Sequence, residues 1–502
     1  MNRFTRLVFW LASLFLFAVE PATARDYFLT IGGGYSPAGN QASLEKNVLF
    51  FQRLLTEQNL DRRPHDIFFA DGESPERDLK VVDRESVPTA NRLMAEFFGT
   101  DRDLGLSYRN HKVPSVQGAT SPRNIRRWFA GRGQTMRRGD RLFLYVTSHG
   151  DSSDDDEKPY DTSISLWNDN QITVSELAGM LDRLPDGVGV VTMMVQCHAG
   201  GFARLIFDRA DPDRGIASQQ RIGFFATMHD REAAGCTAEI DETTYVEYST
   251  YFWEALGGRT RLGKPIDPPD YDGDGRVSFD EAHAYAVLVA NTIDLPIKTS
   301  GEFLRSHSKF GDHEDVTLLA RDAPYGIVQN LATPAQRAVL DGLSDQLELV
   351  GDDRLEAARE QVETLSRRRQ RGRGRRFGRR RTSDRPVDQL RRRIANDIEE
   401  QWPELANVLN PIAVDLVSTR NKEFIQAIEG HADYQRYREL AEREPGPDDR
   451  EKHRVKFERF IRFAENVILA ENLKRSNDPQ KLPQFRAIVH AEGSSLQDSA
   501  SP

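Results

Sequence analysis

The segment Arg141–Ser148 has the sequence RLFLYVTS and is followed directly by His149-Gly150, and the segment Val188–Gln196, VGVVTMMVQ, is followed directly by Cys197. Both segments are short and almost wholly apolar, which is typical of strands that are covered on both faces. Such strands occur in parallel sheets whose strands are joined by helices. We therefore expect a parallel sheet in which one strand ends at a histidine and another at a cysteine.

Three more apolar segments extend this pattern and predict strands at Tyr27–Ile31, Asp66–Ala70 and Ile222–Thr227. Segments with helical spacing of apolar residues lie between them, such as Leu44–Leu55. Ser121-Pro122 has the pattern of a helix start, and Thr173 with Glu176 has that of a capping box. The alternation predicts an α/β domain over residues 25–325, with a mostly parallel sheet covered by helices on both faces.

Beyond residue 325 the sequence predicts helices alone. One begins at Thr333-Pro334, and Phe457–Ile468 carries an apolar face near the end of the chain. We expect an all-α C-terminal domain over residues 326–493. Within it, the arginine- and glycine-rich block 367–381 should form a mobile loop, because it cannot bury itself. Residues 494–502 are predicted to be a disordered tail.

The N-terminal residues resemble an export signal. Leu7–Val19 is apolar and follows two arginines, and Ala22-Thr23-Ala24 is a small-residue cleavage site. We predict a secretory signal peptide over residues 1–24, cleavage after Ala24, and a secreted or periplasmic protein. An uncleaved membrane anchor is the alternative, although the segment is short for a bilayer core of about 30 Å. No later segment is predicted to span a membrane, and the formal net charge of −10 argues against a nucleic-acid partner.

The two strand-end residues point to nucleophilic chemistry. Functional residues of α/β sheets gather at the carboxyl ends of the strands, so His149 and Cys197 should face each other if their strands are neighbours. Imidazole is a suitable base for a thiol. Gly150 has no side chain, so its N–H could approach an oxyanion together with the N–H of Cys197. We predict Cys197 as nucleophile, His149 as base and Gly150 as oxyanion donor.

Other interpretations of these residues stay open. His149 could be an ordinary turn histidine, and Cys197 could be an inert buried thiol. The chain has one other cysteine, Cys236, and export would permit a disulfide between the two. His198 is an alternative base, but its position next to Cys197 at a strand end directs it elsewhere.

The two motifs LYVTS-His149-Gly150 and MVQ-Cys197-HAGG resemble the signatures of caspase-like peptidases, and among these they are most similar to legumains. Phe224–Thr227 and Asp230–Cys236 also fit that family, so the resemblance covers about residues 26–260. It implies a caspase-like fold and a cysteine endopeptidase. It also implies a thioester mechanism with a Cys-His dyad that needs no third member.

The chain departs from that family at the specificity pocket. Legumains and caspases have a charged or amide residue two positions before the cysteine, where this chain has Val195, followed by Gln196. The loop Gly34–Gln41 lacks the arginine that legumains use there. Asparagine specificity therefore cannot be carried over. The acidic loop Asp151–Glu157 could favour basic substrates, or it could be a solvated run of charge.

A separate motif between residues 270 and 281 has the spacing of an EF-hand calcium loop, with carboxylates at positions 1, 3 and 5, glycine at 6 and glutamate at 12. Pro268-Pro269 precludes an ordinary entering helix, so this would be half of an EF-hand. A calcium ion there could clip the domain together or gate activity, and an Asp/Gly turn that binds nothing is the alternative. The predicted Ca²⁺ ligands are Asp270, Asp272, Asp274, Arg276 (through its carbonyl), Ser278 (through water) and Glu281.

These features favour an endopeptidase that acts on a protein or peptide substrate. Its C-terminal domain could contact and cover the active site, as the prodomain does in legumains, and the arginine block could then be a processing site. A transpeptidase or transamidase on the same fold is one alternative. A catalytically silent calcium-binding interaction protein is the other, although it has no need for His149, Gly150 and Cys197 together.

Overall fold

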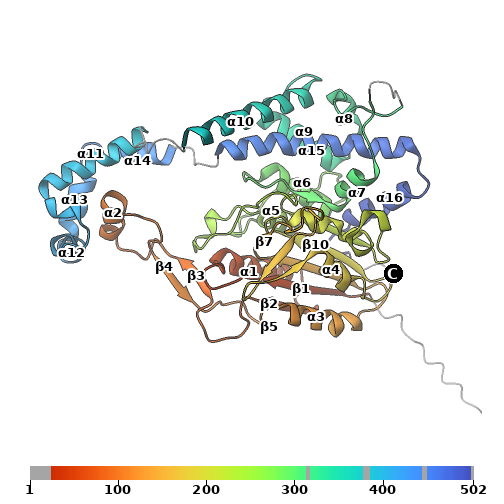
Figure 1. Cartoon of the computed structure of the whole chain (residues 1–502), viewed down its shortest axis with the longest axis horizontal. Helices are drawn as coiled ribbons and strands as arrows, with labels where there is room; N and C mark the ends of the chain where they lie inside the picture. Colours follow the sequence, from red (N-terminus) through yellow and green to blue (C-terminus); the bar gives the residue numbers. More distant parts are fainter. Residues whose placement is uncertain (1–23, 313–316, 377–384, 444–448, 499–502) are drawn as a thin grey trace, which may run out of the picture.

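A seven-stranded sheet forms the centre of the protein, with the strand order β12-β11-β10-β6-β1-β2-β5 (Figure 1). The computed structural model describes residues 24–312, 317–376, 385–443 and 449–498. The strands of this sheet are β1 (Asp26–Gly32), β2 (His65–Phe69), β5 (Val116–Gly118), β6 (Arg141–Thr147), β10 (Gly189–Met194), β11 (Arg221–Phe225) and β12 (Ile297–Lys298).

The sheet is parallel except at one edge. β1 pairs in parallel with β2 and β6, and β10 with β6 and β11, whereas β12 runs antiparallel to β11. The five strands predicted from the sequence are therefore confirmed. The two short edge strands β5 and β12 were not predicted, because they carry too few apolar residues to stand out.

Both faces of the sheet are covered, as its continuous apolar strands require. Alternate residues of β1 point to opposite sides: Phe28 belongs to one core cluster and Leu29 to the other. The first cluster includes residues of α1 (Ala42–Glu57), α5 (Tyr248–Gly257) and α6 (Phe279–Val289). The second includes residues of α3 (Pro122–Ala130) and α4 (Val174–Leu181). The α/β fold class is confirmed.

The predicted helix starts have the expected hydrogen bonds. The Ser121 side chain accepts from the N–H of Asn124 at the start of α3, with proline at the first helical position. At the start of α4, Thr173 and Glu176 form a complete capping box. These local signals satisfy backbone N–H groups that a helix leaves free, so they act independently of the rest of the fold.

Two small antiparallel sheets lie beside the main one and were not predicted. One is the hairpin of β3 (Leu79–Val82) and β4 (Leu106–Arg109), and the other joins β7 (Gly150–Asp151), β8 (Ser163–Leu166) and β9 (Asn170–Thr173). Between β3 and β4 the chain forms α2 (Thr89–Phe98). β7 begins immediately after His149, so the second small sheet fixes the direction in which the chain leaves β6.

The C-terminal half is helical, as predicted, but its core is not separate from that of the sheet. The helix α15 (Asp449–Ser476) runs across the molecule along one side of the sheet domain (Figure 1). Leu469 and Leu473 of α15 and Phe485 of α16 (Lys481–Glu492) belong to the same core cluster as Phe28 of β1. The predicted boundary at 325–326 therefore does not divide two independent cores, because residues far apart in sequence complete one core.

The remaining C-terminal helices pack against α15, against one another, or against α2. α7 (Thr299–His307) lies next to α15 and α16. α8 (Tyr325–Leu331) and α9 (Pro334–Gln346) share a core cluster with α10 (Arg354–Arg376) and α15. A further cluster joins α2 to a lobe at one end of the molecule (Figure 1). That lobe consists of α11 (Pro386–Gln401), α12 (Pro411–Ser418), α13 (Asn421–Glu429) and α14 (Tyr434–Arg443).

The prediction of a mobile loop at 367–381 is wrong for its first part. The helix α10 spans Arg354–Arg376 and so continues into the arginine block, while residues 377–381 lie outside the described part of the chain. Arginine is a good helix former, and a glycine costs a helix only about 1 kcal/mol. A helix already started by packed residues such as Leu355 can therefore extend through such a sequence.

The prediction of a disordered tail is also wrong where the tail is described, at residues 494–498. Leu496 is buried in the main core cluster. The Arg141 guanidinium donates to the carbonyl oxygens of Ser495 and Leu496, at 2.9 and 3.3 Å. This anchoring depends on a residue more than 350 positions away, which local composition cannot reveal.

The predicted signal peptide falls on residues 1–23, outside the described part, apart from Ala24. Within the described residues, no helix has both the length and the apolarity needed to cross a membrane.

Candidate active site

The strands that carry the predicted dyad are neighbours. β6 and β10 pair in parallel, with Val146 opposite Met194 at their carboxyl ends. His149 and Cys197 follow these strands within three residues, so both lie at the same edge of the sheet.

The His149 ring is oriented by a backbone carbonyl. Its Nε2 lies 2.9 Å from the carbonyl oxygen of Gly39. Because a carbonyl can only accept, Nε2 carries the proton, and Nδ1 is left as the basic nitrogen of the neutral ring. Burial lowers the pKa of His149, while the bond to Gly39 and the charge of Asp151 oppose this shift. The ring is therefore poised as a neutral base at neutral pH.

The Cys197 thiol is held by the loop that follows β11. Its Sγ accepts a hydrogen bond from the N–H of Ala233 at 3.3 Å and lies 3.8 Å from the carbonyl oxygen of the same residue. Burial raises the pKa of Cys197, and the Ala233 contact lowers it less strongly. The resting thiol therefore keeps its proton and needs a base to become a nucleophile.

A second thiol lies beside the base. Sγ of Cys236 is 3.8 Å from Nδ1 of His149, whereas the hydrogen-bond contacts of Cys197 Sγ among the described residues are with Ala233. Both cysteines are free thiols, so the possible disulfide between them is not formed here. The sequence predicted Cys236 only as a disulfide partner or as part of a family motif. Its place against His149 was not predicted.

Gly150 occupies a position where only glycine fits. A Cβ atom built there would lie 2.4 Å from the carbonyl oxygen of Cys197 and 2.9 Å from that of Ser163. The backbones of Gly150 and Cys197 are thus packed directly against each other. The N–H of Cys197 donates to no other group within the described residues. This leaves it available to an oxyanion.

The alternative base, His198, is hydrogen-bonded to the loop that follows β11. Its backbone is left-handed, with φ of 60°, and its Nδ1 lies 2.8 Å from the carbonyl oxygen of His229. Its N–H donates to the carbonyl of Arg231. These contacts make His198 a support of the loop after β11.

The loop 228–236, which contacts both Cys197 and His149, is anchored from the C-terminal half. The N–H of Ala234 donates to the buried Asp294 carboxylate at 2.6 Å. Arg231 makes two hydrogen bonds to Glu458 of α15, at 2.6 and 3.1 Å. Helix α15 therefore holds a loop of the candidate site through a charged, two-point contact.

The two residues before Cys197 are buried. Val195 is buried in the core cluster of the sheet. Gln196 is also buried, and its Oε1 has no hydrogen-bond partner among the described residues. The acidic loop Asp151–Glu157 is almost wholly exposed. The position that legumains and caspases use for specificity is thus buried in this chain.

The predicted calcium loop has the backbone turn that such a site requires. Carboxylate oxygens of Asp270, Asp272 and Asp274 lie within 4.8 Å of one another. Gly275, at loop position 6, has φ of +85°, which favours glycine. The described residues between α5 and α6 contain no helix, as Pro268-Pro269 predicted.

The other predicted ligands lie at the start of α6. Ser278 and Glu281 form a capping box, and the Glu281 carboxylate also accepts from the N–H groups of Tyr271 and Asp272. The Arg276 side chain pairs with Asp274 and Asp498, so only its carbonyl could serve an ion. Three converging carboxylates and a glutamate that closes the loop fit a Ca²⁺ ion.

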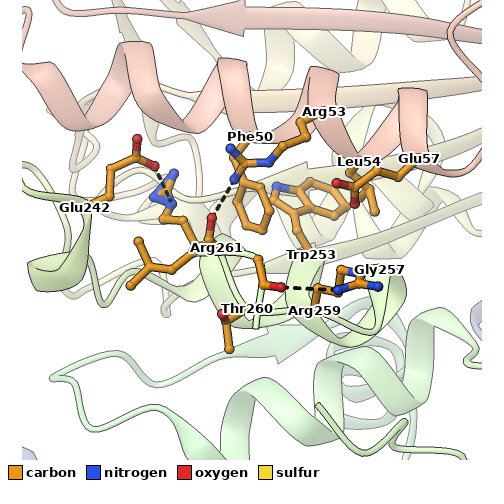
Figure 2. Close-up of a pocket in the computed structure, with 12 residues that line it drawn as sticks. Phe50, Arg53, Leu54, Glu57, Glu242, Trp253, Gly257, Arg259, Thr260 and Arg261 are labelled. Carbon is orange, nitrogen blue, oxygen red and sulfur yellow. Dashed lines mark hydrogen bonds and ion pairs between the residues drawn. The ribbon is translucent and has the colours of Figure 1, made fainter. Parts of the chain in front are cut away.

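A separate cavity of about 320 Å³ lies between α1 and the loop that follows α5 (Figure 2). Its arginines already have partners: Arg53 donates to the carbonyl of Arg261, Arg259 donates to that of Gly263, and Arg261 pairs with Glu242 and Glu247. None of the predicted catalytic residues lines it. We regard this cavity as part of a buried structural network.

Comparison with known proteins gives one distant relative. The chain is 27% identical over 132 residues to metacaspase-4 of Arabidopsis thaliana, a match that covers 22% of this chain and 31% of the plant protein. The match thus spans less than a third of that relative. It supports membership of the caspase-like group at a coarse level and does not single out the legumains.

Two further comparisons add little. No family model matches the chain. A structural-genomics protein from Geobacter sulfurreducens matches 55% of this chain and 92% of its own length at 11% identity, with a TM-score of 0.32. At that TM-score the similarity supports no conclusion about fold or function.

Proposed function

We propose that the protein is a cysteine endopeptidase of the caspase-like type, with Cys197 as nucleophile and His149 as base. The observation that carries this proposal is the arrangement at the sheet edge. A histidine oriented by the Gly39 carbonyl and a half-buried thiol follow adjacent parallel strands. The partial match to metacaspase-4 supports the same class. The closer resemblance to legumains rests on the motifs around His149-Gly150 and Cys197, and on the stretches Phe224–Thr227 and Asp230–Cys236.

The proposed reaction begins with proton transfer from Sγ of Cys197 to Nδ1 of His149. The thiolate attacks the scissile carbonyl carbon, and the oxyanion accepts hydrogen bonds from the N–H groups of Gly150 and Cys197. The tetrahedral intermediate collapses, the C–N bond breaks, and the imidazolium gives its proton to the leaving amine. Water then attacks the thioester with His149 again as base, which releases the acid and restores the thiol.

The resting geometry implies one rearrangement before catalysis. Cys197 must exchange its contact with Ala233 for one with His149, and Cys236 must leave the position beside Nδ1. Catalytic hydrogen bonds are commonly long or absent without substrate and form in the bound complex. A peptide lying along the loop 228–236 would displace these contacts.

The test is peptide cleavage by the mature protein. It is incubated with a proteome-derived peptide mixture, and new termini are found by mass spectrometry. We expect Cys197→Ala to reduce cleavage by at least about 10³-fold. The matched variant Cys236→Ser should keep it, because that thiol is not the proposed nucleophile. Loss of activity in Cys236→Ser alone would make Cys236 the nucleophile, and silence of the wild-type protein would contradict the proposal.

The same assay separates hydrolysis from acyl transfer. A peptide amine is added at increasing concentration, and ligated products are counted beside hydrolysed ones. Hydrolysis in excess at all concentrations supports the endopeptidase. A dominant ligated product would instead establish a transpeptidase on the same residues.

We also propose that residues 270–281 bind one Ca²⁺ ion that stabilises the link between α5 and α6. The ligands would be the carboxylates of Asp270, Asp272, Asp274 and Glu281, the carbonyl of Arg276 and a water on Ser278. At a free Ca²⁺ concentration 100 times the Kd, binding adds about 2.7 kcal/mol to the free energy of unfolding. Ca²⁺ added to the metal-free protein should therefore raise the melting temperature of the wild type and leave that of Asp270→Asn unchanged. Equal shifts in both would contradict the site.

Export and a role of the C-terminal helices complete the proposal. Sequencing the N-terminus of the mature protein from the medium or periplasm tests cleavage after Ala24. The Arg231–Glu458 pair gives the C-terminal half a direct contact with the site. Glu458→Gln should change the rate of peptide cleavage if that contact controls the loop.

A further inference from the structure

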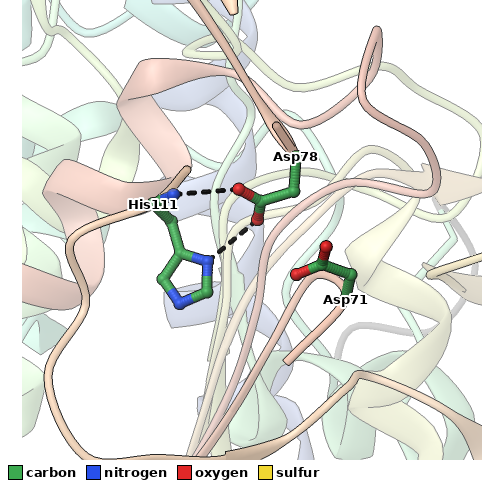
Figure 3. A group of neighbouring side chains, drawn as sticks. All are labelled: Asp71, Asp78 and His111. Carbon is green, nitrogen blue, oxygen red and sulfur yellow. Dashed lines mark hydrogen bonds and ion pairs between the residues drawn. The ribbon is translucent and has the colours of Figure 1, made fainter. Parts of the chain in front are cut away.

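Three side chains that are far apart in sequence converge beyond the end of β2 (Figure 3). Asp71 follows β2, Asp78 directly precedes β3, and His111 follows β4. One ligand atom from each, a carboxylate oxygen or a ring nitrogen, lies within 4.8 Å of the others. None of these residues takes part in the proposed peptidase chemistry.

Asp78 and His111 are fixed in position. Their side chains are 0% and 7% exposed. The backbone N–H of His111 donates to Oδ1 of Asp78 at 2.9 Å, and the His111 Nδ1 lies 2.9 Å from Oδ2. Asn40 donates to Oδ2 and to the backbone carbonyl of Asp78, at 3.2 and 3.0 Å. This pair is therefore preorganised.

Asp71 is the unexplained member of the cluster. Both of its carboxylate oxygens are inaccessible to solvent, and neither has a hydrogen-bond partner among the described residues. Burying an unpartnered carboxylate beside a second carboxylate costs free energy, and a bound cation would offset that cost.

We propose that Asp71, Asp78 and His111 bind one Zn²⁺ ion. The donor set is two carboxylate oxygens and one imidazole nitrogen, which suits Zn²⁺, whereas Ca²⁺ and Mg²⁺ prefer oxygen alone. Three protein ligands leave a fourth position for water. The ion would lie between Asp71 and the pair that already faces it, and would neutralise the two carboxylates.

The site is connected to the candidate catalytic base through two adjacent residues, Gly39 and Asn40. Asn40 contacts Asp78, and its neighbour Gly39 accepts the hydrogen bond from Nε2 of His149. The Asn40 side chain also accepts from the N–H of Gly34, so it closes the loop 34–40 on itself. A bound ion would therefore hold the loop that orients His149.

The binding test must exclude the active-site thiols, because Cys197, Cys236 and His149 could also bind zinc. It therefore uses the full mature chain as the double variant Cys197→Ala, Cys236→Ala. The protein is stripped with chelator and then dialysed against Zn²⁺ with excess Ca²⁺ to occupy the loop 270–281. After gel filtration, the retained zinc is measured by mass spectrometry of the metal, and Co²⁺ is used in parallel for its absorption spectrum.

We expect about one retained Zn²⁺ per chain. In the same background, Asp71→Asn and His111→Gln should each lose at least about 10-fold in affinity. The matched control Asp272→Asn, in the other carboxylate cluster, should keep its zinc. Binding that is absent from the starting protein, or that survives in both site variants, would overturn the proposal.

Unfolding measurements distinguish a variant that has lost the zinc site from a variant that has misfolded. Without metal, Asp71→Asn removes an unpartnered carboxylate and should be at least as stable as its parent. Added Zn²⁺ should raise the melting temperature of the parent and not that of the variant. A metal-free variant less stable than its parent would show that Asp71 has a structural partner, and would also overturn the proposal.

Discussion

Replacing Gly150 by alanine tests the close packing at the candidate oxyanion site. The added Cβ would lie 2.4 Å from the Cys197 carbonyl oxygen, 2.6 Å from Cγ of Gln196 and 2.9 Å from the Ser163 carbonyl oxygen. Two of these three atoms belong to the backbone, so no side-chain rotation relieves the clash. Since such contacts are not tolerated below 3.0 Å, the two backbones must separate by about 0.6 Å or more.

The shift acts on both stability and catalysis. Inserting a methyl group into close-packed structure costs about 1–3 kcal/mol of unfolding free energy. A displacement approaching 1 Å at a reacting centre can cost about 100-fold in rate, or about 2.7 kcal/mol of transition-state stabilisation. We therefore expect kcat/KM for a cleaved peptide to fall about 100-fold, with a smaller loss of stability.

The assay combines peptide turnover with urea unfolding, and Gly179→Ala is the matched control. Gly179 lies within α4, and a Cβ there would meet no atom within 4 Å. The control should keep its activity and gain up to about 1 kcal/mol, because alanine favours helices. If Gly150→Ala stays within about threefold of wild-type kcat/KM and about 0.5 kcal/mol of its stability, the packing argument is refuted.

Two further changes probe the supports of the site. Burial raises the pKa of Asp294 from its ordinary value of 3.8 to about 6, so the folded state binds this proton more tightly and the stability contribution falls as pH rises. The wild-type unfolding free energy minus that of Asp294→Asn should therefore decrease by roughly 3 kcal/mol between about pH 3 and 7; a flat or rising difference, measured by urea titration at each pH, would contradict this. Arg459, buried in α15, donates to the carbonyls of Val287, Ala290, Thr292 and Asp294. Arg459→Leu should cost at least about 3 kcal/mol in urea unfolding, whereas the exposed Lys474→Ala should cost less than about 0.5 kcal/mol; similar losses would mean that α15 is not anchored by Arg459.

The parts of the fold that could be predicted are those with local signals. The five central strands were evident because each is a nearly continuous apolar run, and the starts of α3 and α4 because capping side chains lie within three residues of the groups they satisfy. The neighbouring positions of β6 and β10 followed from the assumption that His149 and Cys197 act together. That assumption came from the need of a thiol nucleophile for a nearby base.

The wrong predictions for the tail, the arginine block and the domain boundary have one cause: each depends on packing against residues that are distant in sequence. The tail at 494–498 appeared polar, but Arg141 and the core fix it in place. The arginine block appeared unable to order itself, but α10 extends into it from packed residues. The boundary predicted at 325–326 missed the contribution of Leu469 and Phe485 to the core of the sheet.

By itself, the sequence determined an α/β sheet with a histidine and a cysteine at strand ends, and a loop with carboxylates at calcium spacing. These are consequences of periodicity and of spacing within short segments. Only the tertiary structure decided that Gly39 orients His149, that Cys236 lies against Nδ1 across 87 residues, and that Asp71, Asp78 and His111 converge. Such contacts form between distant segments when the whole chain packs, and the local sequence does not show which distant side chains will be in contact.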